Sequence, residues 1–135
     1  MKLPEIVLIE DNPGDVFLVE LALKQNQIAH TLTHFESARD AVEVLCGTSP
    51  GSAPPDLILM DLNTPRMDGF DALIQLKQSA RLAGVPIAIL TSSQARRDKL
   101  RAEGLGAKYL EKPSPLDDFL ATVGNAVKEL LPARP

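Results

Sequence analysis

The sequence has only one cysteine and two histidines among its 135 residues. Because Cys46 has no second cysteine to pair with, the chain can form neither an internal disulfide nor a cysteine-based metal cage. The scarcity of histidine further disfavours zinc as the metal of any site in this chain. His30 and His34 lie in one β-rich stretch, and we interpret them as structural or surface residues rather than ligands.

Long apolar runs and an excess of basic residues are also missing. No apolar run approaches the roughly 20 residues of a membrane-spanning helix, and Glu5 and Glu10 interrupt any signal-peptide core near the N-terminus. The 14 Lys and Arg against 18 Asp and Glu give a net charge of −4. This balance argues against a nucleic-acid binder, because such proteins present a basic face. We therefore expect a cytoplasmic protein that binds neither nucleic acid nor a membrane.

The apolar content suits one folded domain. Hydrophobic residues make up 44% of the sequence, which excludes a disordered chain, and the length predicts a single domain over residues 1–135. Short apolar runs alternate with helical patterns, which is typical of an α/β, doubly wound five-stranded parallel sheet covered on both faces. The predicted strands are 6–9, 28–35, 57–60, 86–90 and 107–110, and the predicted helices are 15–26, 38–46, 69–78, 94–103 and 115–131.

Local signals mark two helix starts and one loop. Ser37 begins a capping-box-like pattern before helix 38–46. Ser114 is a predicted N-cap, and Pro115 after it suits the first helical position. The Pro, Gly and Ser residues between 47 and 55 indicate a surface loop.

The candidates for function are the residues at which the strands end, because parallel sheets bind ligands beyond the carboxyl ends of their strands. Glu10 and Asp11 end one strand, and Asp61 ends another. Two like charges about 4 Å apart repel by about 4 kcal/mol at an effective dielectric of 20, so such a cluster favours a cation. Mg²⁺, which prefers oxygen ligands and retains water, is the natural guest.

Two further strand ends supply a hydroxyl, Thr91, and a cation, Lys112. With Mg²⁺, these groups can neutralise the three outer oxygens of a phosphoryl group in transfer. A carboxylate can itself act as the nucleophile and become an aspartyl phosphate. Asp61 is the best placed of the three acids, because the turn over 63–65 leaves it at the tip of the middle strand.

Four motifs, in order and at strand ends, resemble the receiver domains of two-component response regulators along nearly the whole chain. The motifs are Ile9-Glu10-Asp11-Asn12, Met60-Asp61-Leu62-Asn63-Thr64-Pro65-Arg66-Met67-Asp68-Gly69, Leu90-Thr91-Ser92 and Tyr109-Leu110-Glu111-Lys112-Pro113. Each motif alone is a weak to moderate signal, whereas the four together are a strong one. The resemblance implies a flavodoxin-like receiver fold with strand order 2-1-3-4-5. It also implies a phosphoacceptor switch that catalyses only its own phosphorylation and dephosphorylation, and not an enzyme.

The resemblance implies how the acidic residues would act. Asp61 would accept the phosphoryl group. Asp11, Asp61 and the backbone carbonyl of Asn63 would bind Mg²⁺ directly, and Glu10 would act through a metal-bound water. Thr64 is the main local departure, because receiver domains usually carry an apolar residue at its position.

The remaining implied roles concern the switch. Thr91 would be the hydroxyl that follows the phosphate, and Lys112 would be the lysine of the receiver site. The bond from Lys112 to Pro113 is often cis in the family. Tyr109 would be the aromatic switch residue, which turns inward when Thr91 moves.

A finer resemblance concerns the partner. The motif of residues 10–15 and the long loop before Asp56 resemble small, stand-alone regulators that serve phytochrome-type histidine kinases. A sensor histidine kinase would then supply the phosphate. Without an output domain, the signal would leave through a downstream protein, a phosphotransfer partner or a homodimer. The charged run 96–101 is either a solvated face or part of such an interface.

Two other functions remain as alternatives. Residues 61–64 resemble the Asp-x-Asp-x-Thr motif of haloacid-dehalogenase-like phosphatases. However, Asn63 replaces the second acid, which serves there as general acid and base, and no cap domain fits in 135 residues. A flavodoxin-like cofactor binder would need a phosphate-cradling first loop, whereas the first loop here is acidic.

Overall fold

The computed structural model describes residues 3–47 and 53–131, and most of the predicted loop 47–55 lies outside these ranges. Five strands alternate with five α-helices in the described residues. The strands are β1 (Glu5–Ile9), β2 (Thr31–Phe35), β3 (Leu57–Met60), β4 (Ile87–Thr91) and β5 (Lys108–Glu111). The helices are α1 (Pro13–Gln25), α2 (Ala38–Leu45), α3 (Gly69–Gln78), α4 (Arg96–Gly104) and α5 (Leu116–Leu130), with a short 3-10 helix over Ala80–Leu82.

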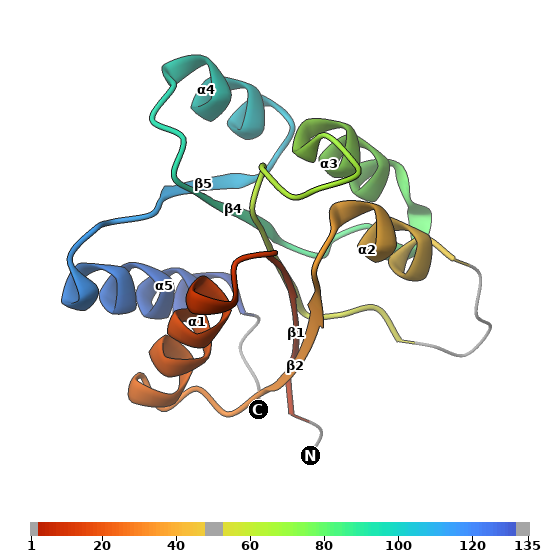
Figure 1. Cartoon of the computed structure of the whole chain (residues 1–135). Coiled ribbons are helices and arrows are strands. Elements are labelled where there is room, and N and C mark those ends of the chain that lie inside the picture. The colour runs from red at the N-terminus through yellow and green to blue at the C-terminus, as the bar shows by residue number, and fades with distance from the viewer. Residues whose placement is uncertain (1–2, 48–52, 132–135) are drawn as a thin grey trace.

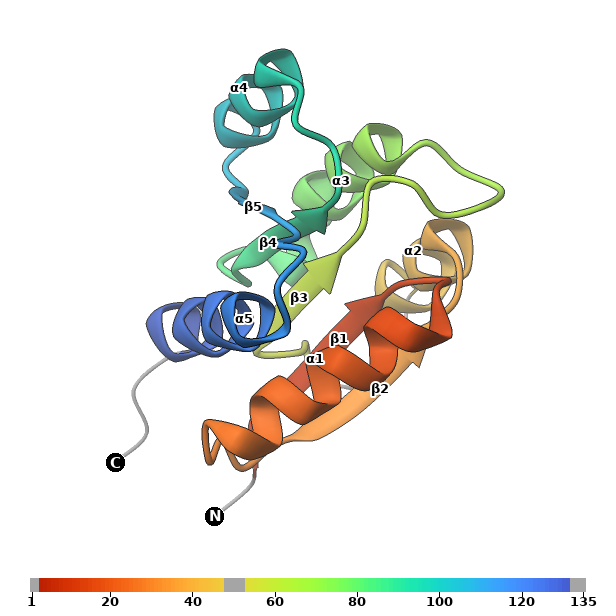
Figure 2. The same cartoon turned by 60° about the vertical axis from the view of Figure 1, so that its left-hand side comes forward.

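The five strands form one parallel sheet in the order β2-β1-β3-β4-β5, which confirms the predicted topology (Figure 1 and Figure 2). Strand β1 lies beside β3, with Ile9 opposite Met60. Since Glu10 and Asp61 are the next residues of these two strands, the register places them side by side at the carboxyl edge of the sheet. This edge is therefore where the predicted site is assembled.

The core has two layers, one on each face of the sheet (Figure 2). Helices α1 and α5 pack on one face, where Ile6 and Leu8 of β1 point. Helices α2, α3 and α4 cover the other face, where Val7 and Ile9 point. Because the central strands are buried on both sides, they contain continuous apolar runs over 6–9, 57–60 and 87–90 instead of an alternating pattern. Among the described residues, no helix is both long and apolar enough to cross a bilayer.

Some element boundaries differ from the prediction because of local capping. Helix α1 begins at Pro13 rather than residue 15, because the Asn12 side chain caps it and proline suits the first helical position. Ser37 is the N-cap of α2, as predicted, and its Oγ accepts from the Asp40 amide at 3.2 Å. The predicted N-cap Ser114 is wrong. Pro115 adopts an extended conformation with ψ of 135°, so α5 starts one residue later without a side-chain cap.

Candidate functional site

Three carboxylates meet where β1 and β3 end. Oxygens of Glu10, Asp11 and Asp61 lie within 4.8 Å of one another. Glu10 and Asp61 are buried, with 2% and 7% of their surface exposed, whereas Asp11 is exposed. The Nε2 of His34, on β2, donates to the backbone carbonyl of Glu10 at 2.6 Å, so this histidine serves the structure of the strand end. The acidic residues predicted as a cluster from the sequence are therefore adjacent in space.

Lys112, just after β5, points its ammonium into this cluster. Its Nζ lies 2.7 Å from Oε1 of Glu10 and 3.0 Å from Oδ2 of Asp61. The Lys112 amide also donates to the Thr91 carbonyl at 2.7 Å, which fastens the start of the β5–α5 loop to the end of β4. The predicted lysine, which follows the outermost strand β5, thus contacts both buried acids.

Asp15 is a member of the site that sequence reasoning missed. It lies in the first turn of α1, and its Oδ2 accepts from Lys112 Nζ at 2.7 Å. The only signal in the sequence was its place at the end of the acidic motif 10–15. That motif does not reveal a contact with a lysine 97 residues away, which only the folded chain creates.

Burial and the charge of Lys112 set the electrostatics of the site. This one cation lies among four acids, which are Asp15 and the cluster of Glu10, Asp11 and Asp61. Burial raises the pKa of Glu10, the charge of Asp61 adds to this rise, and Lys112 opposes it. Burial lowers the pKa of Lys112, but hydrogen bonds to Asp15, Glu10 and Asp61 outweigh it and leave that pKa well above its ordinary value. The lysine therefore remains charged, and the site as a whole is negative. An excess of clustered carboxylates around one ammonium favours binding of a further cation.

The loop after β3 is bonded to both Asp61 and α2. The Asn63 amide donates to Oδ1 of Asp61 at 3.1 Å, which orients the carboxylate. The buried Thr64 accepts at Oγ1 from the Ala38 amide at 3.0 Å, so it satisfies a free N–H at the start of α2. This bond gives a physical reason for a polar residue where receiver domains usually carry an apolar one.

A chain of hydrogen bonds leads from Thr91 away from the cluster. Thr91 is fully buried, and its Oγ1 accepts from the Ser93 amide at 3.3 Å. The Ser93 carbonyl in turn accepts from the hydroxyl of Tyr109 at 2.7 Å. The Ser93 hydroxyl donates to Asp98 of α4 at 2.7 Å, although the N-cap of that helix is Ala95. The two predicted switch residues are therefore connected through a single serine.

The bond between Lys112 and Pro113, which the resemblance implies is often cis in the family, is not cis here, because the described residues contain no cis peptide bond. In the trans form, the Lys112 amide still bonds to Thr91 and the side chain still reaches the acids. The contacts of the site do not require the cis isomer.

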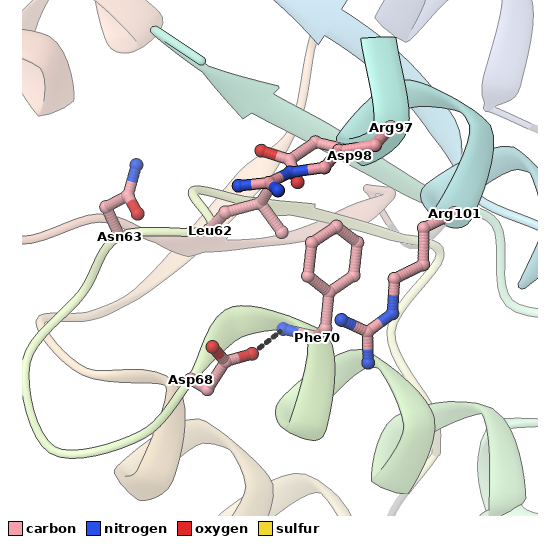
Figure 3. Close-up of a pocket in the computed structure, with 7 residues that line it drawn as sticks. All are labelled: Leu62, Asn63, Asp68, Phe70, Arg97, Asp98 and Arg101. Carbon is pink, nitrogen blue, oxygen red and sulfur yellow. Dashed lines mark hydrogen bonds between the residues drawn. The ribbon is translucent and has the colours of Figure 1, made fainter. Parts of the chain in front are cut away.

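A pocket of about 420 Å³ lies between the β3–α3 loop and α4 (Figure 3). Asp68 caps α3 by accepting from the Phe70 amide at 2.8 Å. The guanidinium of Arg101 lies 4.3 Å from the centroid of the Phe70 ring, a cation–π contact that joins α4 to α3. Asn63 also lines this pocket, so the pocket adjoins the loop that orients Asp61.

The fold and this arrangement of acids and lysine define the class of the protein. The response regulator receiver domain family model matches residues 6–124, and the chain belongs to that family, as the sequence predicted. Because the chain belongs to this family, the family assignment takes the place of the two alternatives, a phosphatase and a flavin-binding protein. Response regulators of this family receive phosphate from sensor histidine kinases.

Among its relatives, the chain is 35% identical over 121 residues to the response regulator Rcp1 of Synechocystis, covering 87% of this chain and 82% of Rcp1. The phosphorylated cyanobacterial phytochrome response regulator RcpA superposes with a TM-score of 0.87 at 27% identity, covering 98% of this chain and 100% of that one. The Mn²⁺-bound form of Rcp1 gives a TM-score of 0.84 at 33% identity, covering 96% and 99%. The predicted likeness to phytochrome response regulators is confirmed.

Proposed function

We propose that this chain is a single receiver domain that takes a phosphoryl group onto Asp61 from the phosphohistidine of a sensor kinase. A carboxylate oxygen of Asp61 forms the new O–P bond while the N–P bond of phosphohistidine breaks and the imidazole leaves. The observation that carries this proposal is the position of Asp61. Its carboxylate is buried, oriented by the Asn63 amide at 3.1 Å and 3.0 Å from the Lys112 ammonium. In such a preorganised site, the Lys112 ammonium together with a bound cation would neutralise the negative charge of the phosphoryl oxygens.

The acidic cluster suits Mg²⁺ as the metal. Asp11, Asp61 and the backbone carbonyl of Asn63 would hold the ion directly, and Glu10 would hold it through a water. Carboxylate oxygens of Glu10, Asp11 and Asp61 within 4.8 Å fit this donor set. The Mn²⁺-bound form of Rcp1 shows that this relative binds a divalent cation. When bound, Mg²⁺ shields the acids from the incoming phosphoryl oxygens.

Lys112 and Thr91 would bind the oxygens of the new phosphoryl group. A move of the Thr91 hydroxyl towards that group would release its bond from the Ser93 amide and disturb the bond between Ser93 and Tyr109. The relative populations of two conformations of the surface formed by residues 94–110 would then change. This surface would carry the signal to a downstream protein, to a phosphotransfer partner or to a second copy of the chain.

The likeness to RcpA supports a kinase of the phytochrome type as the phosphodonor. A cytoplasmic location follows from this partnership. The kinase would present its phosphohistidine at the carboxyl edge of the sheet, where the Asp61 carboxylate lies.

The test is phosphorylation by a small acyl phosphate in the presence of Mg²⁺, followed by intact-mass measurement. The wild-type chain is expected to gain one phosphoryl group, and Asp61→Asn to gain none. Asp71→Asn, which neutralises an exposed acid in the first turn of α3, is the matched control and is expected to react like the wild type. A mass gain in Asp61→Asn that equals that of the wild type would refute the assignment.

A further inference from the structure

Lys112 has a third carboxylate partner that lies outside the metal-binding cluster. An ammonium has three N–H donors, and here three oxygens surround it: those of Glu10 and Asp15 at 2.7 Å and that of Asp61 at 3.0 Å. Asp15 contributes no oxygen to the cluster of acids that could share a metal ion. Its side chain is 23% exposed, whereas that of Lys112 is only 11% exposed. Asp15 therefore contacts the lysine from the solvent side of the site.

We propose that Asp15 is a positioning residue that holds the Lys112 ammonium against the cluster during phosphoryl transfer. This proposal rests on the proposed function of Asp61. Once Asp61 binds a metal and a phosphoryl group, the N–H that pointed at its Oδ2 is free to turn to a phosphoryl oxygen. Asp15 keeps its own bond through this exchange, because it takes no part in either event. The lysine side chain is flexible, and a hydrogen bond to Asp15 that does not change keeps its ammonium in position while another acceptor is exchanged.

Local structure fixes Asp15 in place for this role. The Oδ1 of Asn12 accepts from the Gly14 amide at 2.9 Å and from the Asp15 amide at 3.3 Å, and Pro13 stiffens the first helical position. The first turn of α1 is thereby held rigid under the lysine. Asp15 then presents its carboxylate from a fixed backbone, as a positioning residue requires.

A plainer role for Asp15 would be that of an acid in the first turn of a helix, where negative charge favours the helix dipole. Asp71 provides the matched comparison. It is also the third residue of its helix, and its amide donates to the N-cap side chain of Asp68 at the same distance of 3.3 Å. Within the part of the chain that the structure describes, the Asp71 carboxylate has no lysine partner. Removing Asp71 therefore tests the dipole effect without the contact to Lys112.

The contact itself is tested by nitrogen-15 NMR of lysine ammonium groups, because only an ammonium held in hydrogen bonds exchanges slowly enough to be seen. We expect a Lys112 signal in the wild type and in Asp71→Ala, and its loss in Asp15→Ala. Asp15→Asn keeps the size of the side chain and one neutral acceptor, so it should give a weakened signal even if Asp15→Ala fails to fold. A full Lys112 signal in both Asp15 variants would overturn the contact.

The role in transfer is tested by the rate of phosphorylation with a small acyl phosphate at saturating Mg²⁺. Asp15→Ala is expected to be slower on the order of tenfold, as for a misplaced reacting group, and Asp71→Ala to match the wild type. An unchanged rate in Asp15→Ala, or an equal loss in Asp71→Ala, would overturn the positioning role. A wild-type chain that takes up no phosphoryl group would instead overturn the proposed function. The Lys112 ammonium signal does not depend on phosphorylation. It therefore shows whether the contact between Asp15 and Lys112 exists even if the chain takes up no phosphoryl group.

Discussion

The hydroxyl of Tyr109 donates a 2.7 Å hydrogen bond to the backbone carbonyl of Ser93. The amide of the same serine donates to Oγ1 of Thr91 at 3.3 Å. The fully buried hydroxyl of the site and the single tyrosine of the chain are thus joined across one residue of the β4–α4 loop. Because the two bonds use the N–H and the C=O of the same residue, a displacement of either side chain that shifts the backbone of Ser93 also alters the other bond.

Replacing Tyr109 by Phe removes the bond to Ser93 and keeps the ring in its half-buried position. We expect a loss of about 1 kcal/mol in the free energy of unfolding and faster amide hydrogen exchange over residues 92–96. Exchange in α1, on the opposite face of the sheet, serves as the internal control and should not change. Unchanged protection over residues 92–96 would show that the hydrogen bond does not restrain this loop.

Mg²⁺ is expected to stabilise the folded chain, because it relieves repulsion in a cluster that exists only in the native state. At a concentration of 100 times the dissociation constant, the gain is about 2.7 kcal/mol. Asp61→Asn removes one of the repelling charges, so its melting temperature without metal should lie above that of the wild type. The same variant should respond less to Mg²⁺. Thermal melts with increasing Mg²⁺ measure both effects, and an equal response in the two proteins would contradict a site that includes Asp61.

Lys112 makes the stability of the chain dependent on pH. Its folded-state pKa lies above the ordinary value of 10.5, so its ion pairs contribute fully from neutral pH up to about pH 10.5 and are lost as the pH rises through the folded-state pKa. Near neutral pH, Lys112→Met leaves buried carboxylates unpaired, and we expect a loss of about 3 kcal/mol in the free energy of unfolding.

That loss should shrink at both ends of the pH range. The pKa of Glu10 is raised above its ordinary value of 4.5, so protonated Glu10 favours the folded state below that value, and this contribution disappears as the pH rises through the folded-state pKa. At low pH protonated Glu10 loses little when Lys112 is removed, and at high pH the wild-type lysine is itself neutral. Urea unfolding at several pH values measures the difference. Lys108→Met, which breaks an ion pair with the exposed Glu129, is the control and should cost less than about 1 kcal/mol.

Gly69 begins α3 where the helix touches the loop after β3. A Cβ at this position would lie 2.5 Å from the Cα and the carbonyl oxygen of Leu62, so even alanine would push the loop away. We expect Gly69→Ala to lower the free energy of unfolding by about 1–3 kcal/mol, as overpacking does. The control is Gly104→Ala in α4, where no atom beyond the neighbouring residues and the backbone of the same helix lies within 4 Å of the added Cβ. That variant should be stabilised by about 0.5 kcal/mol, and a similar loss in both variants would contradict the close approach at Leu62.

The sequence alone determined the fold and the cluster of acids. Continuous apolar runs such as 57–60 predicted strands buried on both faces, and the alternation with helices predicted a parallel sheet, since both signals depend only on local order. Glu10 and Asp61 were predicted as neighbours because parallel strands bring their carboxyl ends to one edge. The boundaries were less exact at Pro13 and Ser114, where one or two backbone angles decide the first turn of a helix.

The tertiary structure alone decided which groups outside the motifs join the site. Asp15 meets Lys112, and Thr64 meets the free amide of Ala38, only after α1, α2 and the β3–α3 loop have packed around the sheet. Likewise, the bond between Tyr109 and Ser93 depends on where α4 and β5 lie relative to each other. These contacts join residues far apart in the sequence, and a hydrogen bond forms only within a few tenths of an ångström of its ideal length. Residue type and spacing carry no information at that precision, whereas the packed fold does.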